Sequence, residues 1–277
     1  MRNPQVFRKK NPIPERTGQA QGSAPADMSE KNRGHKTLSP KLMRIWDIHP
    51  GYLNRQSLLG EHRELHGMAS IILHNKKGYS RHPETLRWKP HLSGLIMRHE
   101  FLVAEMALRG YNHRSPLDRE TGAVSWPEIF IDPPGGQFRI LKEKYKDREE
   151  GRIPLPGSAQ ALWAHHKYSV LARDPEYYRR IGPALSGPAP RLSFDRLAEM
   201  LVRLMRQPPP RGRLINALMH MWGYVSDMEN RETGKKLPDH PADALHRIRQ
   251  LALENHADYL VRSTALSDLS VWTAAAV

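Results

Sequence analysis

Apolar residues recur at three- and four-residue spacing after Asn54, which is the pattern of an amphipathic helix. Asn54 is a suitable N-cap, because its side-chain oxygen can accept a hydrogen bond from the first helical turn. A turn is predicted just before it, at His49-Pro50-Gly51. The helix carries a dense charged cluster beside its apolar stripe. The stripe is Leu58, Leu59, Leu65, Met68, Ala69, Ile72 and Leu73, and the cluster is Glu61, His62, Arg63, Glu64 and His66.

Helical periodicity recurs along the rest of the chain, whereas strand patterns are weak throughout. Glycine and proline mark the expected ends of the helices. The stretch 78–90 is predicted to be a loop. Further helices are predicted over 91–108, 138–150, 159–174, a short segment from Pro175, 194–206, 213–228 and 241–263. The expected fold class is therefore all-α.

Composition divides the chain into three parts. Residues 1–42 are rich in Pro, Gly, Ser, Lys and Arg and have no period, which predicts either a disordered basic tail or a mis-assigned start before Met43. A first helical domain is predicted over 43–150. A Gly- and Pro-containing linker then leads to a second helical domain over 158–277.

The formal net charge is +14, and the sequence pI is about 10.1. This excess predicts a polyanionic partner, with nucleic acid favoured over membrane, although solubility alone is an alternative reading. Residues 1–42 hold nine Lys and Arg against three Asp and Glu, so much of the excess lies there. The chain has no cysteine, which excludes disulfides and thiolate metal sites and fits a reducing compartment. No apolar run is long enough to predict a transmembrane helix, and the polar start is no secretory signal.

Two pairs in the charged cluster have spacings that chemistry can use. Glu61 and Glu64 share a helix face, so one carboxyl could take a raised pKa for acid–base work, or both could form an ordinary solvated surface. His62 and His66 have the i, i+4 spacing of a zinc-binding pair. Their motif is HRELH rather than HExxH, however, and no third ligand is evident, so no metal is predicted.

The loop from Arg81 to Lys89 interleaves basic and aromatic residues. Phosphate and base contacts require this combination, although an ordinary basic loop would look the same.

Residues 43–148 resemble the pyrimidine-dimer DNA glycosylase family, which is the phage endonuclease V-like family. The resemblance rests on an MRxWxxHPxYLxxQ opening, on an ExREL run at Glu61-His62-Arg63-Glu64-Leu65, and on a GYxxHPxxxR loop. The residues that match are Met43, Arg44, Ile45, Trp46, His49, Pro50, Tyr52, Leu53, Gln56, Gly78, Tyr79, His82, Pro83 and Arg87.

The resemblance implies a compact helical fold and a repair enzyme that captures the deoxyribose of damaged DNA as an imine. Met43 would stand at the nucleophile position, Glu64 would manage protons, and Arg63 would contact the substrate. The residues implied to bind DNA are Arg44, Gln56, His82, Arg87 and Lys89. The chain departs from the family at His66-Gly67, where the phage enzyme has Pro-Arg, and at Ser57, where it has His. These departures bear on dimer specificity.

An α-amine suits imine chemistry, because its pKa of about 7.7–8.0 leaves on the order of a third of it neutral at pH 7.5, against ~0.1% for an ordinary lysine. Met43 is internal in the 277-residue sequence, which conflicts with this role. Translation could start at Met43, residues 1–42 could be cleaved off, or a lysine could take over. The lysines considered are Lys41, Lys76 and Lys89.

Residues 158–266 resemble the YbgA-like domain of unknown function, through runs that include His166-Lys167-Tyr168, Gly182, His220 and Gly223-Tyr224. This part is expected to be either a packed helical module or a second nucleic-acid contact. In the second case, its phosphate-binding residues would be Lys167, Arg173, Arg179 and Arg180.

The sequence as a whole predicts a monomeric DNA repair glycosylase and AP lyase that acts on double-stranded DNA with pyrimidine-dimer or abasic damage. It would need no cofactor and would be cytoplasmic and nucleoid-associated. One alternative is a non-catalytic nucleic-acid-binding adaptor, favoured if a tail blocks the amine. Another is a metal hydrolase that uses His62, His66 and a carboxylate.

Overall fold

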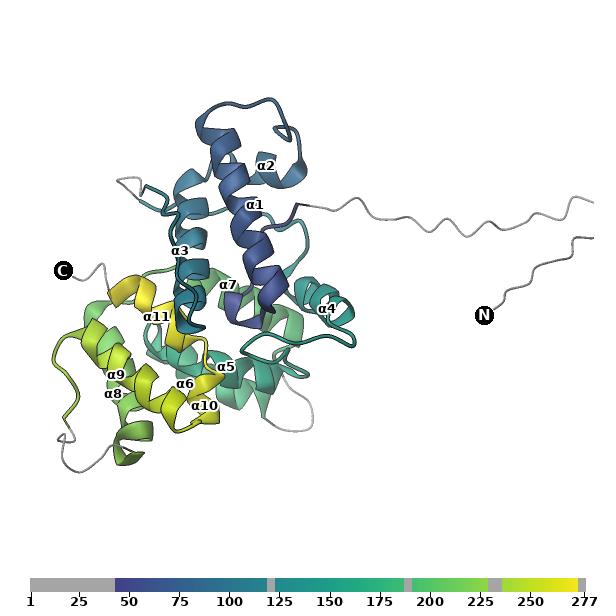
Figure 1. The fold of residues 1–277 in the computed structure, drawn as a ribbon. Helices are drawn as coiled ribbons and strands as arrows, with labels where there is room; N and C mark the ends of the chain where they lie inside the picture. Colours follow the sequence, from purple (N-terminus) through teal and green to yellow (C-terminus); the bar gives the residue numbers. More distant parts are fainter. Residues whose placement is uncertain (1–42, 119–122, 187–190, 229–235, 274–277) are drawn as a thin grey trace, which may run out of the picture. The chain divides into compact units, whose positions relative to one another are not determined.

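The computed structural model describes residues 43–118, 123–186, 191–228 and 236–273. All regular secondary structure in these ranges is helical, so the all-α prediction is confirmed (Figure 1). The predicted tail, residues 1–42, lies outside the described residues. Among the described helices, none combines the length and the apolar character needed to cross a bilayer.

The first predicted helix is present, and Asn54 caps it as expected: its side chain accepts a hydrogen bond from the backbone N–H of Ser57 at 2.9 Å. The predicted loop 78–90, however, contains a short helix that begins at Pro83 under a His82 cap. The elements up to residue 150 are η1 (Pro50–Tyr52), α1 (Arg55–Leu73), α2 (Pro83–Trp88), α3 (Leu92–Leu108) and α4 (Pro134–Lys144).

The later helices follow the predicted order, with one wrong prediction. The single helix expected over 241–263 is broken, because the chain turns at His256, whose φ is +50°. The elements after residue 150 are α5 (Ala159–Leu171), α6 (Pro175–Leu185), α7 (Phe194–Met205), α8 (Arg211–Val225), η2 (Ser226–Met228), α9 (Pro241–Glu254), α10 (Asp258–Val261) and α11 (Ala265–Thr273).

Helices from the two predicted domains pack directly on one another. Helix α3 packs on both α1 and α11, and α4 packs on α7. The larger hydrophobic cluster contains residues of α1, α3 and α4 together with residues of α5, α6 and α7. Both predicted domains fall within one compact unit of the fold. They thus share a core, and their division into separate folding units stays a prediction.

The predicted linker is part of this packing. Ile153 is fully buried, and its backbone N–H donates to the carbonyl of Gly51 at 3.0 Å. Gly151 lies so close to the turn at residues 50–52 that an added Cβ would stand 2.5 Å from the Gly51 carbonyl oxygen. The predicted linker therefore packs against the turn at residues 50–52, just before α1.

Candidate functional site

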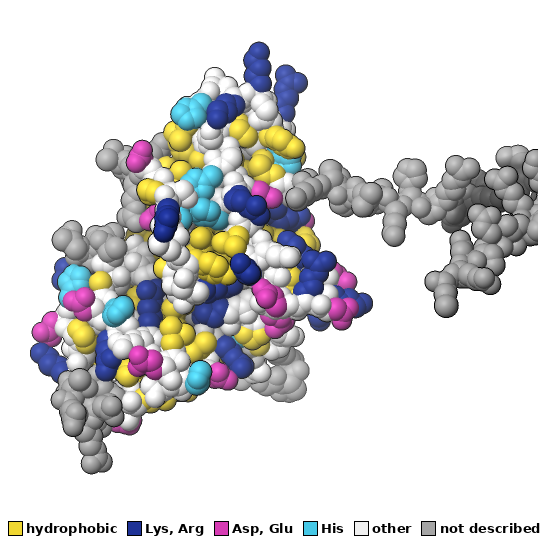
Figure 2. All heavy atoms as spheres, in the orientation of Figure 1, with side chains coloured by type: hydrophobic (Ala, Val, Ile, Leu, Met, Phe, Trp, Pro, Cys, Tyr) yellow, Lys and Arg dark blue, Asp and Glu magenta, His cyan; other side chains and the backbone are white. Residues whose placement is uncertain are grey.

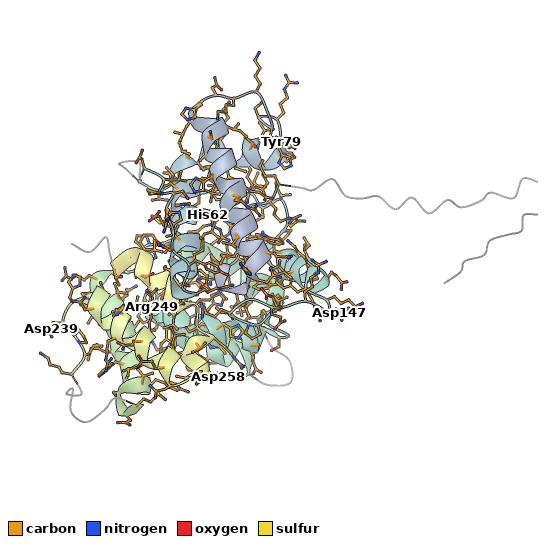
Figure 3. The ribbon with its side chains drawn as sticks, viewed as in Figure 1. His62, Tyr79, Asp147, Asp239, Arg249 and Asp258 are labelled. Carbon is orange, nitrogen blue, oxygen red and sulfur yellow. The ribbon has the colours of Figure 1, made fainter. Side chains whose placement is uncertain are left out.

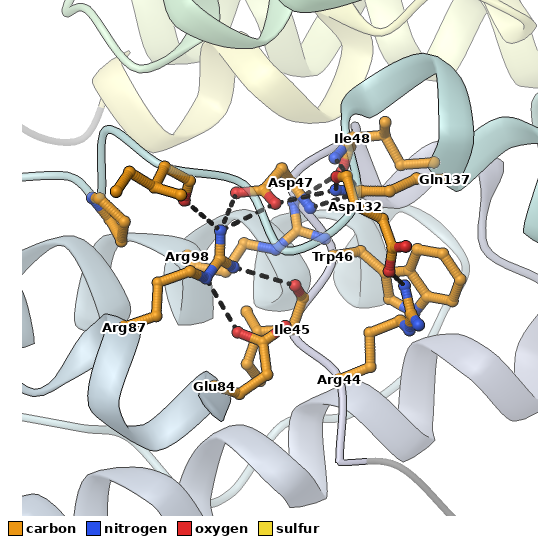
Figure 4. A network of polar contacts seen from close by, with 12 residues as sticks. Arg44, Ile45, Trp46, Asp47, Ile48, Glu84, Arg87, Arg98, Asp132 and Gln137 are labelled. Atoms are coloured by element: carbon orange, nitrogen blue, oxygen red, sulfur yellow. Dashed lines mark hydrogen bonds and ion pairs between the residues drawn. The ribbon is translucent and has the colours of Figure 1, made fainter. Parts of the chain in front are cut away.

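The site begins with the extended segment of residues 43–49, which we call the opening segment. Side chains of α1, α2, α3 and α4 bind its backbone, and Figure 4 shows those of α2, α3 and α4. Gln137 of α4 accepts from the N–H of Asp47 at 2.8 Å, and its amide donates back to the Asp47 carboxylate at 2.9 Å. Arg98 of α3 donates to the carbonyl of Ile48 at 2.8 Å. Because its polar groups are satisfied in this way, the segment is held in one place beside α1.

Glu64 and the opening segment meet at one short hydrogen bond. The backbone N–H of Arg44 donates to Oε2 of Glu64 at 2.7 Å. Met43 precedes Arg44 directly, so its nitrogen lies within roughly 6.5 Å of that carboxylate oxygen, allowing one residue of extended chain. Met43 and Glu64 are both partly buried, and the Met43 side chain packs on the core. Two of the three predicted catalytic residues are therefore neighbours.

Glu61 lies in a different environment from Glu64. Only 2% of it is exposed, and its carboxylate accepts from the guanidinium of Arg98 at 2.8 and 2.9 Å and from the N–H of Trp46 at 3.1 Å. Burial raises the pKa of Glu61, the Arg98 charge opposes this, and Asp47 is the acidic neighbour that adds to it. We interpret Glu61 as a structural anchor of the opening segment rather than as a partner of Glu64 in acid–base chemistry.

A lysine that sequence reasoning did not consider lies near Glu64. Desolvation lowers the pKa of Lys144, at the end of α4, while the charge of Glu64 raises it and the charges of Arg148 and Arg44 lower it. Helix α4 reaches this position because the Tyr145 hydroxyl accepts from the N–H of Asn54 at 2.9 Å, next to the start of α1. No local sequence signal could have predicted this, since the contact spans 91 residues.

The residues predicted to bind DNA, together with the predicted substrate contact Arg63, fall into two groups. Arg63, Gln56 and Lys89 are exposed, and His82 is partly exposed while its Nδ1 caps α2. Arg44 and Arg87 instead have internal partners.

Arg44 forms an ion pair with Asp132, and its guanidinium lies 5.0 Å above the Trp46 ring. The Arg87 side chain is only 6% exposed, and its guanidinium contacts Asp47 at 3.0 Å and Glu84 at 2.9 Å (Figure 4). It also donates to the carbonyl of Ile45 at 3.3 Å. Both arginines thus bind groups of the protein itself and help to hold residues 44–47 in position.

The segment between α1 and α2 forms a shallow basic groove that carries an exposed aromatic ring. Tyr79 is 72% exposed and takes a φ of +55°, which is unusual for a residue with a side chain (Figure 3). Its neighbours in the groove are Lys77, Ser80, Arg81 and His82. The exposed Tyr79 ring thus lies among basic side chains, and nucleic-acid contact by the loop from Arg81 to Lys89 stays a prediction.

In the second half of the chain, Arg179 and Arg180 are exposed and Lys167 is partly exposed, with its amine 6.0 Å from the Tyr259 ring. The prediction that Arg173 contacts phosphate is wrong. Arg173 is 3% exposed, and its guanidinium makes two contacts with the Asp268 carboxylate, at 2.8 and 2.9 Å. A buried arginine needs such a partner, and this one joins the segment that follows α5 to α11.

Two comparisons with family models match parts of the chain. Residues 43–119 match the model described as pyrimidine dimer DNA glycosylase, and residues 167–240 match the model described as a protein of unknown function (DUF1722). Neither the curated proteins nor the solved structures compared with the chain include a match. The first matched range contains Met43, Arg44, Arg63 and Glu64, and the second contains Arg206, whose guanidinium lies 2.6 Å from the Asp47 carboxylate. The chain therefore joins a segment similar to pyrimidine dimer DNA glycosylases to a segment similar to the DUF1722 proteins, and the two are in contact at the Arg206–Asp47 ion pair.

Proposed function

We propose that this protein is a DNA repair glycosylase and AP lyase that attacks damaged DNA with an α-amine at Met43. The observation that carries the proposal is the 2.7 Å hydrogen bond from the Arg44 N–H to Glu64, which sets the start of residue 43 beside a carboxyl group. The glycosylase family match over the same residues supports it.

The chemistry follows from an amine next to an acid. The neutral amine gives its electron pair to C1′ of the deoxyribose, and the base leaves with the electrons of its bond to C1′. Glu64 accepts a proton from the amine and returns one to the ring oxygen as the sugar opens, which gives the imine. Loss of a C2′ proton then expels the 3′ phosphate and cuts the strand.

The exposed groups around this site suit a bent or opened duplex. Arg63 and Gln56 extend from the exposed face of α1, and Lys89 lies at the end of α2. Tyr79 offers a ring on which an extruded base or a flanking base can stack. We assign Arg44 and Arg87 to holding the opening segment, so that exposed cations rather than these two contact phosphate. Arg179 and Arg180 are the residues that a second nucleic-acid contact would use. The protein would act as a monomer on DNA in the cytoplasm.

The proposal requires a free amine at residue 43, through a start at Met43 or removal of residues 1–42. Of the lysines first considered, Lys41 lies outside the described residues. Lys76 donates to Ser70 at 2.7 Å, and Ser70 lies about 9 Å further along α1 than Glu64. Lys144, whose charge interacts with Glu64, is the better-placed substitute.

Borohydride trapping on abasic-site duplex DNA tests the proposal. Two forms should be compared, one that begins at Met43 and one with all 277 residues. We expect a covalent adduct from the first form, at least about 100-fold weaker for Glu64→Gln, and little adduct from the second. Lys144→Ala and its exposed neighbour Lys142→Ala serve as a matched pair, and both should still be trapped.

Other outcomes assign the chemistry differently. An adduct from both forms that Lys144→Ala abolishes would make Lys144 the nucleophile and remove the α-amine from the proposal. If neither form gives an adduct but both still bind DNA, the result would contradict the proposed glycosylase and lyase activity and would favour a non-catalytic adaptor.

A further inference from the structure

Four histidines converge where α1 packs on α3. His62 and His66 lie one turn apart on α1, His99 lies on α3, and His113 lies in the segment that follows α3. One ring nitrogen of each lies within 4.8 Å of those of the other three. Figure 3 shows His62 beside α3, and Figure 2 shows histidine side chains reaching the surface in the same region.

The distances in this cluster suit a tetrahedral metal ion. Zinc binds imidazole nitrogen at about 2.0–2.1 Å, so two nitrogens of a tetrahedral site are about 3.3–3.4 Å apart. Nε2 of His62 and Nε2 of His66 are 3.3 Å apart. The remaining nitrogens, at up to 4.8 Å, need only small side-chain rotations to reach the same separation.

His99 gives an independent indication of a ligand. Its ring is fully buried, and its Nδ1 lies 3.1 Å from Oε1 of Glu100. Its other nitrogen, Nε2, is buried without a hydrogen-bond partner, which is costly for a polar atom. In metal sites, one ring nitrogen of a histidine commonly donates its N–H to a carboxylate. The other nitrogen then keeps a lone pair that can bind the metal.

Burial also favours the uncharged form of three of these imidazoles, those of His62, His66 and His113. Burial lowers the pKa of His62 to about 4, and the other three rings contribute in the same direction. Burial likewise lowers the pKa of His66 and His113. Neutral imidazole is the form that binds a metal, so the shifts at His62, His66 and His113 agree with the site that the nitrogen distances and the unpartnered Nε2 of His99 indicate.

We propose that His62, His66, His99 and His113 bind one divalent transition-metal ion, preferably Zn²⁺, in a structural site. Four protein ligands leave no open coordination position, so the ion would clasp the segment after α3 onto the α1–α3 pair rather than activate water. Glu64 stands two positions from both His62 and His66 and therefore projects from another side of α1. The metal site is thus separate from the proposed imine chemistry.

Metal titration of the full-length protein tests this site. Protein stripped with EDTA is titrated with Zn²⁺ alone by calorimetry, and with Co²⁺ while the visible spectrum is recorded. The informative variants are His66→Asn and His113→Asn, because both residues are only partly buried and their loss should leave the fold intact. His74→Asn, which is exposed just beyond the end of α1, is the matched control, and circular dichroism checks folding.

We expect one Zn²⁺ per chain, with affinity at least tenfold weaker in His66→Asn and in His113→Asn and unchanged in His74→Asn. Bound Co²⁺ should show the visible bands of a four-coordinate ion, and each informative variant should lose them. Substoichiometric Zn²⁺ binding, or equal affinity in all variants, would overturn the proposal and leave a metal-free histidine cluster. Borohydride trapping would be unaffected by that result.

Discussion

At the scale of single residues, the environment separates two carboxylates that the sequence places together. Glu61 and Glu64 lie three positions apart on α1, and their spacing predicted a shared face. The sequence could not predict that Arg98, from α3, would neutralise one of them inside the core, while the backbone of Arg44 would bind the other at the edge. The helical period determines on which side of α1 each carboxylate lies. Residues distant in sequence determine whether that carboxylate is buried in an ion pair or available at the edge of the core.

Replacement of Glu61 by Gln should therefore affect stability more than that of Glu64. It leaves the buried Arg98 guanidinium without a charged partner, so the free energy of unfolding should fall by about 3 kcal/mol. Glu64→Gln should change it by less than about 1 kcal/mol while weakening the trapped adduct at least about 100-fold. Urea unfolding measures both. Equal losses of stability would show that the two residues share one structural role.

The histidines predict a loss of stability in acid. Burial lowers the pKa of His166 to about 3, whereas in the unfolded chain it is about 6.5. Between these values the unfolded state binds a proton that the folded state does not. The stabilising contribution is therefore complete above pH 6.5 and is lost as the pH falls, by about 2 kcal/mol at pH 5.

His166→Phe should remove this contribution. The slope of unfolding free energy against pH, between pH 5 and 6, should become shallower by about 1 kcal/mol per pH unit. Exposed His246→Phe is the control, and urea titrations at several pH values measure the slopes. An unchanged slope for His166→Phe would mean that the ring becomes protonated within the fold.

At the scale of elements, the long periodic helices were predictable and the breaks between them were not. Helix α2 has a His82 cap, Pro83 in its first turn and Arg87 in its last, yet six residues are too few to show a period. The break after α9 is a Schellman-type turn, in which the Ala257 N–H donates to the Ala252 carbonyl at 2.9 Å. Its left-handed residue is His256 rather than the usual glycine, so the signal was missing.

His256→Gly should consequently stabilise the protein. Glycine takes a φ of +50° without strain, so we expect a gain of about 0.5–1 kcal/mol in unfolding free energy. His246→Gly, on the exposed face inside α9, should instead cost about 0.5 kcal/mol. Thermal and urea unfolding measure both. A loss at His256 would indicate that its side chain makes a stabilising contact.

At the scale of the whole molecule, the fold class and the two family segments were predictable, but the shared core was not. Tyr52 contacts His165 and His166 across more than a hundred residues, with its hydroxyl 3.2 and 3.4 Å from their Nδ1 atoms. Arg206 of the second segment likewise contacts Asp47 of the first. Such contacts have no local signature, because each residue alone fits a generic helical surface.

Arg206→Ala should weaken both stability and the proposed chemistry. Asp47 loses one of its two arginines, and the guanidinium leaves the faces of Trp126 and Phe130, so we expect a loss of about 2–3 kcal/mol. The trapped adduct should decrease because residues 43–49 loosen. Arg203→Ala, which removes an exposed ion pair with Glu199 and a contact with the Phe130 ring but no partner of Asp47, should cost less than about 1 kcal/mol. Equal effects would show that Arg206 is an ordinary surface residue.

The burial of Tyr52 against the later helices has a consequence for inheritance. A recombination event that separated the two segments would expose, in each product, the apolar surface that the other segment now covers. It would also leave Tyr52 in one product and His165 in the other without their hydrogen-bond partner. We therefore expect that neither segment can be replaced by an unrelated domain without loss of stability. Substitutions at Tyr52 should be accompanied by compensating substitutions at His165 and His166.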